Sequence, residues 1–110
     1  TKETLINYTD NNKVVLAGIL EILKDELIDT LKDLIDNIAK EDLKGVNDAG
    51  HKLYGTAVSS GMAILSKMSA ELELVTVFDK KSLLEKLALI RNEIELVLSQ
   101  VQLQKQSLEV

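Results

Sequence analysis

The chain of 110 residues contains a single histidine, His51, and no cysteine. One imidazole without thiolates offers too few ligands for most zinc sites, so we expect no metal site in the chain. A Ser-His-Asp triad would need an enclosed pocket, which a small aliphatic helical domain seldom provides. A neutral imidazole is a good nucleophile near neutral pH, and a phosphoryl group that it accepts can be passed on again. The residue types therefore favour nucleophilic phosphoryl transfer at His51.

The helix predicted around His51 places the imidazole on its outer side. An apolar stripe recurs at steps of three and four residues and comprises Leu43, Val46, Gly50, Leu53 and Ala57. At 100° per residue, His51 lies about 140° from the centre of this stripe. Residues predicted to share the outward side include Lys44, Asn47, Asp48, Gly55 and Val58.

Gly55 lies four residues after His51, one helical turn along the same outward face. A glycine inside a helix costs about 1 kcal/mol relative to alanine. Its predicted role is to let another molecule approach the imidazole closely, and Asn47 and Val58 are predicted to take part in the same docking surface. The alternatives are that Gly55 is a chance weak position or marks the end of the helix.

The elements that must position these residues are helices. Proline is absent, and apolar residues recur with helical spacing from Leu16 to Ile38 and from Leu83 to Val101. The spacing predicts a short helix over residues 2–8, followed by helices over residues 13–39, from about 43 to 58, from about 61 to 75, and from about 80 onward. Short loops between them favour an antiparallel up-and-down four-helix bundle, all-α, preceded by the short N-terminal helix.

Polar residues before each stripe are the predicted helix caps. Thr9 or Asp10 is predicted to cap the second helix and Glu41 or Asp42 the third. We expect Ser59 or Ser60 to cap the fourth. The last helix is expected to begin near Asp79 or Ser82, and Ser82 with Glu85 has the spacing of a capping box.

Composition limits the classes of function. A length of 110 residues predicts one domain over residues 1–110, and aromatic residues are only 3%, so the core must be aliphatic. The formal charge of −5 argues against binding to nucleic acid. No apolar run is long enough to span a membrane, and no segment resembles a signal peptide. We expect a cytoplasmic domain without membrane contact.

The segment His51-Lys52-Leu53-Tyr54-Gly55-Thr56-Ala57-Val58-Ser59-Ser60-Gly61, followed by Leu72-Glu73, resembles the histidine-containing phosphotransfer (Hpt) domain family. The resemblance implies a phosphorelay intermediate: His51 accepts a phosphoryl group from a receiver-domain aspartate and passes it to another receiver. It implies that Glu73 orients the imidazole. It also implies response-regulator receivers as partners, with a hybrid sensor histidine kinase as a further candidate, and no cofactor in the chain itself, because the receiver brings Mg²⁺.

Two positions depart from the family pattern. Tyr54 stands where the family usually has Lys or Arg, and Ser60 stands where it usually has leucine. Lys44, two turns before the histidine, is the better candidate to compensate the charge of a phosphate, because Lys52 is about 100° around the helix. Tyr54 is therefore expected to limit support for the phosphorylated form.

Two other readings of the sequence compete with the carrier. A dimerisation helix of a histidine kinase follows its histidine with an acidic residue and soon a proline, whereas this chain has Lys52 and no proline. We therefore expect a phosphocarrier without kinase activity of its own. A non-catalytic helical interaction or dimerisation module is the remaining alternative, and it would not need His51.

Overall fold

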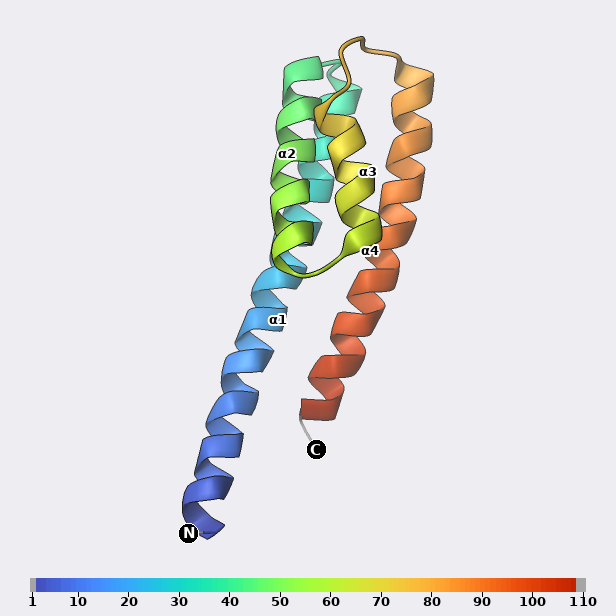
Figure 1. Cartoon of the computed structure of the whole chain (residues 1–110). Coiled ribbons are helices and arrows are strands. Elements are labelled where there is room, and N and C mark those ends of the chain that lie inside the picture. The colour runs from blue at the N-terminus through green and yellow to red at the C-terminus, as the bar shows by residue number, and fades with distance from the viewer. Residues whose placement is uncertain (1, 109–110) are drawn as a thin grey trace.

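The computed structural model describes residues 2–108 and the side chains from residue 12 onward. It contains four helices, α1 (Lys2–Ala39), α2 (Leu43–Ser59), α3 (Ala63–Glu73) and α4 (Lys80–Leu108). They run alternately up and down (Figure 1). Among the described residues, the backbone of each helix lies close to its two neighbours around the bundle, and diagonally opposite helices are further apart. The predicted all-α antiparallel four-helix bundle is confirmed.

The predicted short N-terminal helix is not a separate element. Residues 2–39 form one continuous helix of 38 residues, so Thr9 and Asp10 lie inside it rather than at a cap. No proline or glycine occurs between residues 2 and 17. Since capping residues are tolerated within a helix at modest cost, nothing in this stretch ends α1.

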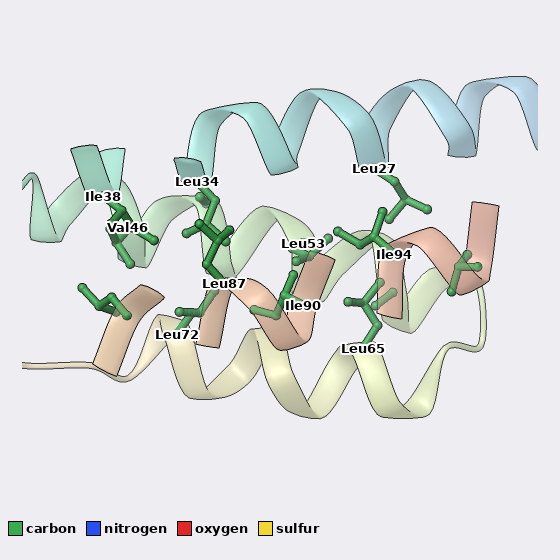
Figure 2. Close-up of a cluster of buried hydrophobic side chains, with 14 of the residues drawn as sticks. Leu27, Leu34, Ile38, Val46, Leu53, Leu65, Leu72, Leu87, Ile90 and Ile94 are labelled. Atoms are coloured by element: carbon green, nitrogen blue, oxygen red, sulfur yellow. The ribbon is translucent and has the colours of Figure 1, made fainter. Parts of the chain in front are cut away.

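The core is a column of aliphatic side chains along the bundle axis (Figure 2). The apolar stripe of α4 is buried over its whole predicted length, and so is most of the stripe of α2. In α1, however, Leu16 and Ile19 are exposed although the pattern placed them in the core. The reason is that α1 and α4 continue past the turn between α2 and α3, where no second pair of helices covers them (Figure 1).

Two turns close with the same hydrogen-bond pattern. At the end of α1, Asp42 N–H donates to Asn37 O and Glu41 N–H to Ile38 O, with Glu41 at a φ of 57°. This is a Schellman motif, which normally has glycine at the position of positive φ. The end of α2 repeats it with Gly61 at a φ of 72°.

The helix starts agree with the sequence in part. Asp42 caps α2 as predicted, since its carboxylate accepts from Gly45 N–H at 3.0 Å. The N-cap of α3 is Met62, without a side-chain cap, so the expectation of Ser59 or Ser60 was wrong. Ser60 is instead the C-cap of α2. At α4, Asp79 Oδ1 accepts from Ser82 N–H at 3.3 Å, so the cap is Asp79 rather than Ser82.

Over the described part of the chain, no helix is both long and apolar enough to cross a membrane.

Candidate functional site

His51 lies in the middle of α2 with its imidazole in solvent. The side chain is 73% exposed, whereas Leu53 and Ala57 on the inner face of the same helix are buried. The outward position predicted from the helical wheel is therefore where the structure places the ring. Solvent and any macromolecular partner can reach it without a change in the fold.

Glu73 is the final residue of α3, and its carboxylate lies against the imidazole. Glu73 Oε1 is 2.8 Å from His51 Nδ1, and the Glu73 side chain is 35% exposed. A carboxylate can only accept a hydrogen bond, so this contact requires the ring proton on Nδ1. In the neutral ring, the second nitrogen, Nε2, then carries the lone pair.

Gly50 is the site residue whose role the sequence did not indicate. It is buried, and a Cβ at this position would lie 2.8 Å from both Glu73 N and Leu72 Cβ. The absence of a side chain therefore lets the backbone of α3 approach α2 directly beside the histidine. A glycine within an otherwise apolar stripe was the available signal, because such a position often marks close packing.

Asn47 does not have the free, outward position that was expected. Its side chain is half-buried, and Nδ2 donates to Leu72 O at 2.9 Å and to Val75 O at 3.0 Å. Both donors of the amide are thus bound to the chain around the end of α3. This leaves the amide of Asn47 committed within the domain rather than available to a partner.

The remaining predicted residues lie on the open side of α2. Tyr54 is 39% exposed and Val58 53% exposed. A Cβ on Gly55 would have no atom within 4 Å, so this glycine packs against nothing within the domain. Lys44 is exposed and forms no ion pair with any described residue, whereas Lys52 lies 3.8 Å from Asp33 of α1. Lys44 is therefore the less engaged of the two cations.

The two groups with a shifted pKa, Glu21 and Lys40, lie away from the site. A hydrogen bond from Lys105 of α4 to Glu21 of α1 joins the two helices. It holds the pKa of Glu21 below its usual value. A hydrogen bond to Asp36 raises the pKa of Lys40 at the end of α1. These pairs bear on the helices that support the site, not on the imidazole.

No cluster of metal-binding side chains occurs within the described residues. A recess of about 610 Å³ lies where the turn between α2 and α3 meets α1 and α4, and His51 is not among its lining residues. The described site is therefore an exposed imidazole with one carboxylate in contact with it.

Comparison with known families gives a match over most of the chain. The family model of the Hpt domain matches residues 18–104, which include α2, α3 and most of α1 and α4. Neither a curated protein nor a solved structure shows a significant match to the chain.

Proposed function

The chain belongs to the Hpt domain family, whose members carry phosphoryl groups on histidine in phosphorelays, and we propose that His51 accepts its phosphoryl group from a receiver-domain aspartate and returns it to another receiver. The observation that carries the proposal is the exposed imidazole with Nδ1 on Glu73 Oε1 at 2.8 Å. In the neutral ring, a proton held on Nδ1 by this contact leaves the lone pair on Nε2, which is the proposed nucleophilic atom.

In the proposed step, the Nε2 lone pair attacks the phosphorus of the aspartyl phosphate. A P–N bond forms as the P–O bond to the aspartate breaks, and the aspartate leaves as a carboxylate. The proton stays on Nδ1, so the phosphorylated ring carries a positive charge. Glu73 stabilises this charge because its carboxylate already accepts a hydrogen bond from Nδ1–H. Attack by a second receiver's aspartate reverses the same bonds.

The exposed face of α2 supports a partner that brings its own catalytic groups. Without an enclosing pocket, His51 depends on the receiver for Mg²⁺ and for the residues that neutralise the transferred phosphoryl group. The open space over Gly55 would admit the receiver next to the ring. We expect Tyr54 and Val58 to contact the same partner, and Lys44 to supply positive charge from the preceding turns.

The proposal is tested with a receiver charged by labelled acetyl phosphate. We expect acid-labile label on the wild-type domain and none on His51→Gln, with the same helical circular dichroism for both proteins. Label that persists in His51→Gln would refute the assignment. Wild-type protein that takes no label from any receiver would favour the non-catalytic interaction module.

A second pair of variants tests the approach over Gly55. Gly55→Gln should fold at least as well as wild type, because glutamine is the better helix former and the position is open. Transfer from the receiver should nevertheless fall steeply, since the new side chain stands one turn from the imidazole. Gly18→Gln is the matched control, because Gly18 also has no atom near its Cβ position but lies on α1 rather than on α2. Wild-type transfer in Gly55→Gln would show that the receiver does not dock here.

A further inference from the structure

Asn47 makes two hydrogen bonds that the proposed reaction does not itself use. Its Nδ2 donates to Leu72 O, just before the end of α3, and to Val75 O in the loop that follows. These carbonyls flank Glu73, whose carboxylate contacts His51. One side chain on α2 therefore holds the chain on both sides of the residue that orients the imidazole.

The end of α3 needs such support. The last carbonyls of any helix lack partners within it, and the final turn tends to fray. α1 and α2 close their last turns with a residue of positive φ, Glu41 and Gly61. Between α3 and α4, where every residue is described, no residue has a positive φ. Leu72 O accepts only a long bond of 3.4 Å from Val75 N–H, and Asn47 adds a second donor at 2.9 Å from the neighbouring helix.

Gly50 completes the contact. Asn47, Gly50 and His51 stand at positions i, i+3 and i+4 of α2, so they lie near one another along the side that meets the end of α3. The backbone contact at Gly50 sets the distance between the helices, and the amide of Asn47 fixes the carbonyls that Gly50 brings near. The same turn of α3 carries Glu73, whose Oε1 is 2.8 Å from His51 Nδ1.

We infer that Asn47 is a positioning residue, which holds the last turn of α3 so that Glu73 keeps the ring proton on Nδ1 and leaves Nε2 free. The consequence for transfer rests on the proposed function. The location of the ring proton does not, because it can be measured in the resting protein.

The first measurement is the ¹⁵N NMR spectrum of the His51 imidazole, the only histidine in the chain. In wild type the spectrum should show the tautomer with the proton on Nδ1. In Asn47→Ala it should shift toward the tautomer mixture of Glu73→Ala. Asn47→Leu keeps a side chain of similar size without donors and should give the same shift. Asn92→Ala, on the exposed face of α4, is the matched control and should leave the spectrum unchanged.

The second measurement is a double-mutant cycle on the rate of transfer from a charged receiver. Loss of one hydrogen bond changes a rate or equilibrium constant by roughly two- to tenfold. Asn47→Ala and Glu73→Ala should therefore each lower the rate of transfer by about that factor. If Asn47 acts through Glu73, the double variant should be no slower than Glu73→Ala alone.

The outcomes separate the positioning role from the phosphoryl-transfer assignment. An unchanged imidazole spectrum in Asn47→Ala and Asn47→Leu overturns the positioning role, and so do additive effects in the cycle. Unfolding of both variants would also overturn it, because Asn47 would then determine the fold as a whole. If the spectrum shifts as expected while no receiver labels His51, the positioning stands and the phosphoryl-transfer assignment fails.

Discussion

Two glycines on α2, five residues apart, should respond to alanine in opposite directions. At Gly50 a Cβ would lie 2.8 Å from Glu73 N and from Leu72 Cβ, and 3.1 Å from Leu72 C. Carbon atoms in ordinary contact are about 3.5–4.0 Å apart, so α3 would have to move away by roughly 0.7 Å or more. At Gly55 the same Cβ would meet nothing within 4 Å.

The expected free energies follow from these distances. Overpacking at Gly50 costs about 1–3 kcal/mol, and weakening the bonds of Asn47 adds about 1 kcal/mol. Alanine recovers about 1 kcal/mol through its helix propensity. Gly50→Ala should therefore lower the free energy of unfolding by about 1–3 kcal/mol. In Gly55→Ala only the gain in helix propensity applies, so the free energy of unfolding should rise by roughly 0.5–1 kcal/mol.

Urea unfolding followed by circular dichroism measures both variants under identical conditions. Movement of α3 by about 0.7 Å would also stretch the 2.8 Å contact between His51 and Glu73 beyond the usual hydrogen-bond range. Gly50→Ala should therefore share the altered imidazole spectrum of Glu73→Ala, whereas Gly55→Ala should not. Equal stability of the two alanine variants would refute the close approach of α2 and α3 at Gly50.

Three further predictions concern charge and helix ends. Tyr54→Lys restores the cation usual in the family, so phosphorylated His51 should persist longer; an unchanged half-life would mean that another cation already supports the phosphate. Glu41→Gly relieves the positive φ of 57° and should stabilise the domain by about 0.5–1 kcal/mol in urea unfolding, whereas Gly61→Ala should destabilise it. Lys105 lowers the pKa of Glu21 in the folded state below its ordinary value of 4.5. The pair therefore stabilises the fold above pH 4.5, and this stabilisation is lost as the pH falls through the folded-state pKa. The urea midpoints of wild type and Glu21→Gln should therefore converge in acid, and a constant difference would contradict the ion pair.

Helical periodicity predicted the direction of side chains around the axis of their own helix. It placed His51 outward, and it predicted the buried stripe of α4 residue by residue. The placement of Glu73 beside the ring came from the family resemblance, and the 2.8 Å contact agrees with it. The outward imidazole and the stripe of α4 depend on the spacing of residues within one helix, which a sequence shows directly.

Features that depend on how two helices meet were not predictable in the same way. Asn47 looked outward on the wheel of its own helix, but α3 approaches so closely at Gly50 that the amide is covered. Leu16 and Ile19 fit the stripe of α1, yet they are exposed because α2 is shorter than α1. Periodicity gives a side chain's direction around its own axis and does not give the length or distance of the neighbouring helix.

The pairing of α2 with α3 also bears on the order in which the domain folds. The contacts of the site join residues 22 and 28 apart in the sequence, whereas the bond from Lys105 to Glu21 closes a loop of 84 residues. Loop-closure entropy makes the longer closure more costly by about 1 kcal/mol. We therefore expect the α2–α3 hairpin to form before α1 and α4 join. Gly50→Ala should then slow folding, whereas loss of the Lys105 to Glu21 pair should mainly speed unfolding.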